Sequence, residues 1–278
     1  MTLRILLSMA AVFSLLSACD SEPAQTRQSA KEKHIAAIRQ TLLSSVEAEK
    51  SAVLATTDAE SQAFADESRK QAREIQAQME ELRRQIDEDG RPVELTAMQE
   101  VDRTWTELKS IDERLLPLAV ANSNLKASRL AAAEGAATVD RLVALLTAAQ
   151  AEVTDPDSLR ALAQASIAAL KIQALLAIHI PSSDDGEMSR LEQQIGELQG
   201  QVDRALAKVA SLPELAGAPQ LWSEDRRLTA EILRLSRQNT NVISFDVSVH
   251  EKRHATRDCL AALDKLQAAV ESAPQATR

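Results

Sequence analysis

The chain has 278 residues, a formal net charge of −9 and 45% hydrophobic residues. This acidic balance gives it no electrostatic reason to bind nucleic acid or an anionic lipid surface. Aromatic residues make up only 2% of the sequence, glycine occurs 6 times, and two cysteines are too few for a disulfide framework. The commonest residues are strong helix formers, so we expect an all-α fold that is stabilised by packing.

The first 18 residues have the features of an export signal. Arg4 supplies a positive charge, and residues 5–16 form an apolar stretch that is too short for an ordinary membrane-spanning helix. Residues 16–19, Leu-Ser-Ala-Cys, resemble the lipobox of bacterial lipoproteins. This resemblance implies cleavage before Cys19, a diacylglycerol on its thiol with palmitate among the acyl chains, and anchoring to a membrane. An ordinary cleaved signal peptide is the alternative.

The residues after the lipobox predict a location and a tether. Asp20 resembles the inner-membrane retention signal of enterobacterial lipoproteins, so a periplasmic location on the inner membrane is favoured over the outer membrane. Residues 19–32 are polar and are predicted to form a flexible tether. Helical periodicity then runs to residue 271, and residues 272–278 are expected to be a disordered tail.

Two distinctive segments recur at one spacing and predict an internal repeat. Residues 105–107, Trp-Thr-Glu, return as Trp-Ser-Glu at 222–224, and the Asn-Ser-Asn of 122–124 returns as Asn-Thr-Asn at 239–241. Two such matches in one register favour a duplication, with copies at 33–152 and 153–271. Asp, Ser, Gly and Pro provide the helix ends. The helices are expected at 33–55, 59–87 and 94–150 in the first copy, and at 157–179, 187–210 and 219–271 in the second.

These six helices predict an elongated bimodular bundle of two stacked four-helix layers that share the two long helices. Each long helix would span roughly 85 Å at about 1.5 Å per residue. The short helices of a copy would lie end to end, and the long helices would run parallel, so that equivalent residues lie at one height. Pro117 predicts a kink in the first long helix. Residues 159–180 are apolar, but the charged residues within them indicate a bundle helix rather than a membrane span.

The pattern of two long and four short helices resembles the helical bimodular sensor domains of bacterial chemoreceptors. Residues 51–58 and 115–119 are also similar to four-helix-bundle receptor sensors. The resemblance covers residues 33–271 and implies a periplasmic domain that can hold a small organic acid in each module. No second membrane span or signalling region follows, so we expect ligand capture or sensing on behalf of a partner, rather than direct signalling.

Residues 250–254, His-Glu-Lys-Arg-His, match the His-Glu-x-x-His pattern of zinc enzymes. On a helix His250 and His254 share a face, and Glu251 could activate a zinc-bound water. The first copy keeps only the equivalent Glu134, and zinc proteases pair this helix with a sheet that the composition does not support. We therefore expect a solvated polar face, with no metal, no cofactor and no enzyme activity. A zinc-dependent hydrolase at the two histidines is the remote alternative.

Polar residues interrupt the apolar face of both long helices. The set expected to bind a ligand is Asn122, Asn124, Arg129, Asn239, Asn241 and Asp246. Buried polar groups need partners, so the asparagines either satisfy backbone groups at the helix breaks or line a polar pocket. In such a pocket Arg129 would suit a carboxylate ligand. Parallel long helices would also bring Arg129 and Asp246 together as a buried ion pair.

These expectations combine into a functional hypothesis. The chain is expected to be a non-enzymatic periplasmic lipoprotein that binds a small polar ligand, such as an organic acid, or a partner sensor protein. The alternative is a structural spacer, a coiled-coil-like rod that docks other envelope proteins. A homodimer is compatible with both interpretations. A ligand sensor should contain a polar cavity near the asparagines, whereas a spacer should expose an apolar stripe.

Overall fold

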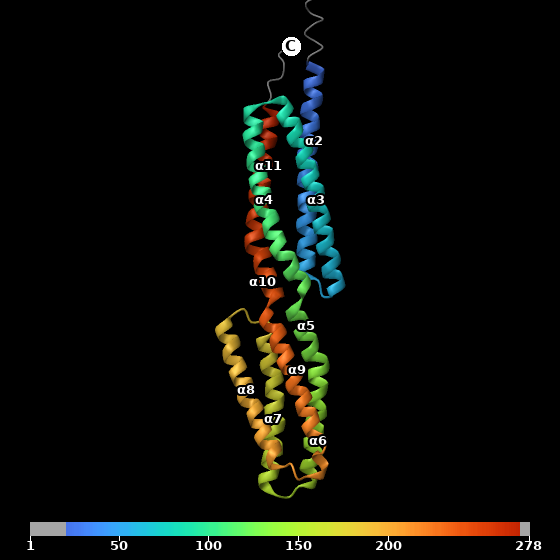
Figure 1. Cartoon of the computed structure of the whole chain (residues 1–278), viewed down its shortest axis with the longest axis vertical. Coiled ribbons are helices and arrows are strands. Elements are labelled where there is room, and N and C mark those ends of the chain that lie inside the picture. The colour runs from blue at the N-terminus through green and yellow to red at the C-terminus, as the bar shows by residue number, and fades with distance from the viewer. Residues whose placement is uncertain (1–20, 273–278) are drawn as a thin grey trace, which may run out of the picture. The chain divides into compact units, whose positions relative to one another are not determined.

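The structure, a computed structural model, describes residues 21–272 (Figure 1). Within this range the regular secondary structure is helical throughout, so the chain is all-α, as its composition predicts. The export signal at 1–18, Cys19, Asp20 and residues 273–278 of the expected tail lie outside the described residues.

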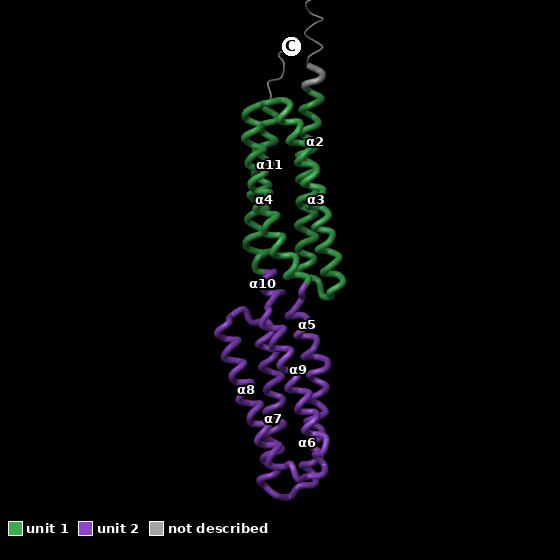
Figure 2. Tube along the Cα trace, viewed as in Figure 1, with its two compact units in different colours: residues 1–120, 246–278 green, residues 121–245 purple. Residues whose placement is uncertain are grey.

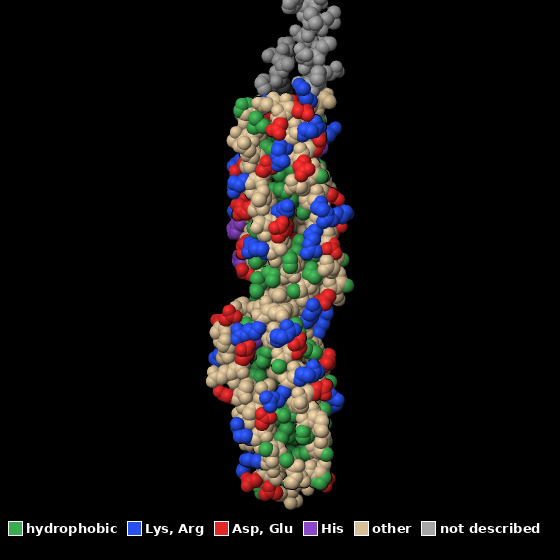
Figure 3. Space-filling view, in the orientation of Figure 1, with side chains coloured by type: hydrophobic (Ala, Val, Ile, Leu, Met, Phe, Trp, Pro, Cys, Tyr) green, Lys and Arg blue, Asp and Glu red, His purple; other side chains and the backbone are tan. Residues whose placement is uncertain are grey.

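The chain divides into two compact units (Figure 2). Unit 1 comprises residues 1–120 and 246–278, and unit 2 comprises residues 121–245. Each unit has its own hydrophobic core, built from side chains such as Leu82 and Leu263 in unit 1 and Leu142 and Ile232 in unit 2. On the viewed face of each unit, side chains of both charges flank a strip of hydrophobic side chains (Figure 3).

Unit 1 is a four-helix arrangement. Its helices are α2 (Ser21–Leu54), α3 (Asp58–Asp89), α4 (Pro92–Ala121) and α11 (Arg253–Glu271), preceded by the π-helical turn η3 (Ser248–Lys252). Helices α2 and α3 lie side by side, because the hydroxyls of Ser45 and Ser68 are 3.2 Å apart and Ser61 Oγ donates to Ala52 O at 2.9 Å. The expected end-to-end placement of the short helices is therefore wrong for this unit. Gly90, with φ +63°, ends α3 in the left-handed conformation that glycine adopts readily.

Helix α2 begins at Ser21, so residues 21–32 are helical and the tether expected there is wrong. The side chain of Lys31 is only 2% exposed. Its Nζ lies 2.6 Å from a carboxylate oxygen of Glu94 and also pairs with Asp89. The sequence did not predict this contact, because the segment is polar and packs through a charged side chain instead of an apolar stripe.

Unit 2 repeats the arrangement. Its elements are α5 (Ser123–Leu130), the π-helical turn η1 (Ala131–Gly135), α6 (Ala136–Glu152), α7 (Pro156–His179), α8 (Asp185–Lys208), the 3-10 turn η2 (Pro213–Leu215), α9 (Ala218–Gln238) and α10 (Thr240–Val247), which ends just inside unit 1. Of the described helices, α7 alone is long and apolar enough to cross a membrane by length and composition. Its inner face, which includes Leu162, Ile172 and Leu176, is buried in the core of unit 2.

The segments of the two long helices run in opposite directions within each unit, so the expected parallel arrangement is wrong. The pairs that show this are Arg114–Glu251 and Asp112–Lys252 in unit 1, and Ser123–Thr240 and Arg141–Glu224 in unit 2. In unit 2 short turns join α6, α7, α8 and α9 in succession, and three reversals leave α9 antiparallel to α6. Among the described residues, equivalent positions therefore lie level around the contacts of Ser123 with Thr240 and of Asn124 with Asn241.

Both long helices are interrupted by an asparagine in the left-handed conformation. Asn122 (φ 51°, ψ 37°) separates α4 from α5, and Asn239 (φ 52°, ψ 29°) separates α9 from α10. Asparagine tolerates this conformation better than most residues that carry a Cβ. The expectation of continuous long helices bent only near Pro117 is therefore wrong, and Pro117 lies inside α4.

Several structural features recur at the spacing of the sequence repeat, which is 117 residues. The left-handed asparagines and the π-helical turns η1 and η3 all follow it. Trp105 and Trp222 are both buried, and each donates its indole N–H to a polar side chain of its own unit, Gln76 and Asp203 respectively. These shared features support the duplication. A π-helical turn also adds a residue to a helix, and so rotates all later residues away from a uniform heptad register.

Candidate functional site

The asparagines singled out in the sequence meet in unit 2, where α5 and α10 cap each other. Ser123 N–H donates to Thr240 Oγ1 at 2.9 Å, and Thr240 N–H donates to Ser123 Oγ at 3.0 Å. Asn124 N–H donates to Asn241 Oδ1, and Asn241 N–H donates to Asn124 Oδ1, both at 3.1 Å. Each helix start thus receives its acceptors from the other helix.

The side-chain amides extend these bonds into a network. Asn124 Nδ2 donates to Asn239 Oδ1 at 2.8 Å and to Ile180 O at 2.7 Å, while Asn241 Nδ2 donates to Asn122 Oδ1 at 2.9 Å. A helix break leaves N–H groups that have no acceptor within the helix. The network satisfies such groups on both helices, which is the structural role considered for these asparagines. We call residues 122–124 and 239–241 the asparagine layer.

A cavity of about 660 Å³ lies in unit 2 beside the asparagine layer. Its polar lining is formed by Asn124, Ser128, Gln173 and Asn241, and none of the residues that line it is charged. Gln173 Nε2 is buried without a hydrogen-bond partner among the described residues. Gly135 of η1 lies against this amide, and a Cβ there would stand 3.5 Å from Gln173 Nε2. Two residues of the predicted set, Asn124 and Asn241, therefore border a mostly apolar cavity that carries a few polar groups.

Asn122 and Asn239 belong to the asparagine layer without lining the cavity, and the last two residues of the predicted set lie elsewhere. Arg129 and Asp246 are both exposed, and neither lines the cavity in unit 2. The Asp246 side chain is 70% exposed and lies 3.5 Å from His250 Nε2. The expected burial of an Arg129–Asp246 ion pair is therefore wrong. Its premise fails because antiparallel helices do not bring equivalent positions level, and because the π-helical turns change which face is buried.

The zinc-like pattern spans the end of η3 and the start of α11, where His250, Glu251 and His254 are all exposed. Glu251 pairs with Arg114 of α4. Among residues 21–272, no group of three or more His, Cys, Asp and Glu side chains is placed to hold a metal ion.

Unit 1 contains a buried charged cluster that the sequence did not indicate. Lys252 is 1% exposed and pairs with Asp112 of α4. Glu49 of α2 is fully buried, and within the described part of the chain neither of its carboxylate oxygens forms a hydrogen bond of normal geometry. Burial raises the pKa of Glu49, and Lys252 and Ser248 oppose the rise. Burial also raises the pKa of Asp112, against the effect of Lys252. We call Glu49, Asp112 and Lys252 the charged triad.

The corresponding place in unit 2 is uncharged. The repeat spacing matches Lys252 with Gly135 and Asp112 with Thr229. Gln173 lies against Gly135, so an amide occupies the region where unit 1 has a carboxylate. The positions that carry charge in unit 1 are therefore uncharged in unit 2, although the buried acid Asp225 lies near Gln173.

Asp225 of α9 is a buried acid in the core of unit 2. Neither of its carboxylate oxygens has a hydrogen-bond partner among the described residues. Burial raises the pKa of Asp225 to about 6. The nearby Gln173 side chain opposes this rise, although its amide does not form a hydrogen bond of normal geometry with the carboxylate. The folded state therefore favours the protonated acid more than the unfolded chain does.

Asp225→Asn is expected to stabilise unit 2 at neutral pH and to have little effect near pH 4. The pKa of Asp225 is about two units higher in the folded state than in the unfolded chain. The wild type therefore loses stability as pH rises through about 6, by up to about 3 kcal/mol. Urea unfolding from pH 4 to pH 8 measures the difference between variant and wild type. The exposed Asp140→Asn is the matched control. A difference that does not change with pH would contradict the prediction.

No family model, curated protein or solved structure matches the chain. The fold and the sites together define a class, an all-α protein of two four-helix units with a cavity in one and a buried charged triad in the other.

Proposed function

We propose that the protein is a non-enzymatic, lipid-anchored binding protein on the periplasmic side of the membrane, with a ligand site in unit 2. Cys19 would carry the lipid, and Asp20 favours the inner membrane. The resemblance to chemoreceptor sensor domains supports a sensing or capture role. The observation that carries the proposal is the cavity of about 660 Å³ beside Asn124, Gln173 and Asn241.

The lining of this cavity favours an uncharged polar ligand over an organic acid, because it contains no cation to balance a carboxylate. Gln173 Nε2 forms no hydrogen bond of normal geometry among the described residues, although Asp225 lies near it, and Asn241 Nδ2 makes one bond where it can make two. A buried donor without an acceptor costs about 1–3 kcal/mol, which a ligand carbonyl or hydroxyl oxygen could recover. Sugars, polyols and simple amides have these groups.

A thermal-shift screen of the chain from residue 20 onward would test the proposal, with sugars, polyols and amides compared against organic acids. We expect at least one uncharged compound to raise Tm, since a ligand at 100 times its Kd adds about 2.7 kcal/mol of stability. Ala132→Leu, at an exposed residue that lines the cavity, should abolish the shift. Ala77→Leu makes the same change in unit 1 and should preserve it.

The screen distinguishes a ligand in this cavity from a ligand elsewhere. A shift that survives Ala132→Leu would place the ligand outside this cavity. The proposal would be contradicted if only organic acids raised Tm, or if no uncharged compound did.

Docking of a partner protein is the second candidate. Helix α7 exposes Ile167, Leu170 and Ile178, whose side chains are about half accessible at 53%, 49% and 51%. Their spacing places them on one side of the helix. An exposed apolar stripe of this kind is typical of a surface that receives another helix, such as that of a sensor protein or of another envelope protein.

A further inference from the structure

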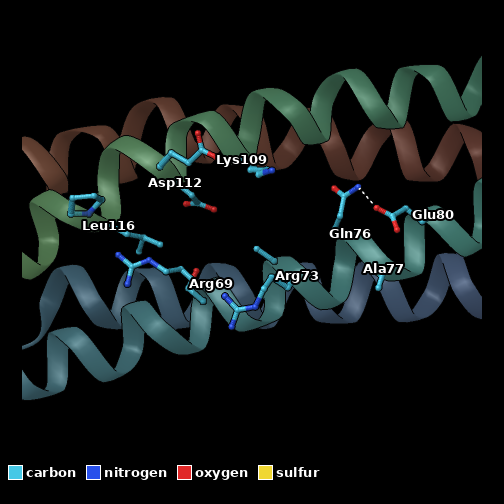
Figure 4. Close-up of a pocket in the computed structure, with 12 residues that line it drawn as sticks. Arg69, Arg73, Gln76, Ala77, Glu80, Lys109, Asp112 and Leu116 are labelled. Carbon is cyan, nitrogen blue, oxygen red and sulfur yellow. Dashed lines mark hydrogen bonds between the residues drawn. The ribbon is translucent and has the colours of Figure 1, made fainter.

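A groove of about 520 Å³ lies between α3 and α4 of unit 1 (Figure 4). It is lined by residues between 68 and 80 of α3 and between 109 and 117 of α4. Twelve residues of helix correspond to roughly 18 Å at about 1.5 Å per residue, so the groove is elongated. Ala72, Ala77, Leu116 and Pro117 give it apolar walls, and the aliphatic stems of its arginines and lysine can extend them.

The groove has a defined polarity along its length. Helices α3 and α4 are antiparallel, because Trp105 Nε1 donates to Gln76 Oε1 at 3.0 Å while Ser61 Oγ donates to Ala119 O at 2.9 Å. Figure 4 accordingly shows Gln76 and Glu80 at one end, joined by a hydrogen bond of 2.9 Å.

The cations lie in the other part of the groove. Arg69 and Arg73 project from α3, and Lys109 lies across the groove on α4 (Figure 4). Arg69 pairs with Asp66 at 2.8 Å, whereas Arg73 and Lys109 have no ion-pair partner among the described residues. Two cations thus line the groove, one on each wall.

The acids in this part do not cancel those cations. Asp112 contributes a carboxylate to the wall, but Lys252 pairs with it from the core. Glu113 is exposed and is the remaining acid that lines this part of the groove. The cationic side chains of Arg73 and Lys109 therefore lie next to an apolar wall.

We propose that this groove binds a single-chain anionic amphiphile, a molecule with a carboxylate or phosphate head and one aliphatic chain. The head lies between Arg73 and Lys109, where cations on both walls can contact its oxygens. The chain lies against Ala72, Leu116 and Pro117, where its burial provides most of the affinity. This site is separate from the cavity of unit 2, so each proposal can fail without the other.

Calorimetric titration of the lipid-free chain tests the proposal with three probes, each kept below its micelle concentration. Decanoate carries both the head and the chain, acetate carries the head alone, and decyltrimethylammonium carries the chain with the opposite charge. We expect decanoate to bind with one site per chain, and the other two to bind at least tenfold more weakly. Arg73→Gln and Lys109→Gln should each weaken decanoate about tenfold, because each removes one charged contact to the head.

Lys70→Gln removes a neighbouring exposed cation of α3 that does not line the groove, and decanoate affinity should not change. Equal binding of decanoate and acetate would reveal a site for small hydrophilic anions and overturn the proposal. Equal binding of decyltrimethylammonium would show non-specific apolar adsorption and would also overturn it. If Lys70→Gln weakened decanoate binding as much as Arg73→Gln, the head group could not lie where it is assigned.

Discussion

Lys252→Met is expected to lower the free energy of unfolding of unit 1 by about 3–5 kcal/mol, the usual cost of removing one partner from a buried ion pair. Methionine fills a similar volume but leaves Asp112 buried without its cation. Glu49 also loses the charge that opposes the rise in its pKa. Urea unfolding at pH 7, followed by circular dichroism, measures the loss.

Two further variants show whether charge is responsible. Combining Lys252→Met with Asp112→Leu and Glu49→Leu should recover much of the lost stability, since apolar replacement of a whole buried charged group is often neutral or stabilising. Lys265→Met removes an exposed lysine of α11 and should change stability little. If Lys252→Met costs no more than Lys265→Met, Lys252 is not buried in solution.

Asn124→Leu is expected to destabilise unit 2 by about 3 kcal/mol or more. The change leaves three polar groups without their partner, namely Asn241 N–H, Ile180 O and Asn239 Oδ1. Each buried polar group that loses its partner costs about 1–3 kcal/mol, and the costs are not fully additive. Urea unfolding at pH 7 tests this, with the exposed Ser128→Leu on the same helix as control.

Asn124 and Asn241 each accept a hydrogen bond from the other, so the prediction can also be tested at Asn241. Asn241→Leu removes the acceptor of Asn124 N–H, so it should cost a similar amount. The double variant should cost clearly less than the sum of the single variants, because both disrupt one network. Fully additive effects would show that the two asparagines do not interact across the helices.

Much of the fold follows from local sequence signals. Thr57 and Asp155 cap the helices that follow them, and Gly90 ends α3, so the breaks expected at these residues are present. The direction of the long helices was not predictable in the same way, because it depends on which helices pack side by side. The helical start of α2 was missed for a related reason, since Lys31 docks onto Asp89 and Glu94, which are distant in sequence.

The two sites differ in how far the sequence could reveal them. The sequence predicted that Asn124 and Asn241 lie at one height from a parallel arrangement of the long helices. They meet instead because antiparallel helices bring equivalent residues level at one point, and both border the cavity of unit 2. The charged triad was missed because charged residues on a helix usually face solvent. Lys252 lies in the π-helical turn η3, and the change of register that such a turn causes cannot be read from the hydrophobic pattern.

The asparagine layer also bears on the history of the chain. Asn124 bonds to Asn241, its own counterpart, and Ser123 bonds to Thr240 in the same way. Contacts between equivalent residues are those of an isologous interface, in which one surface meets an identical surface. If the two halves arose by duplication, a half-length ancestor would have made these bonds between two identical chains. Fusion of its gene copies would then have turned a symmetric homodimer into a single polypeptide, and freed Gly135 and Lys252 to diverge.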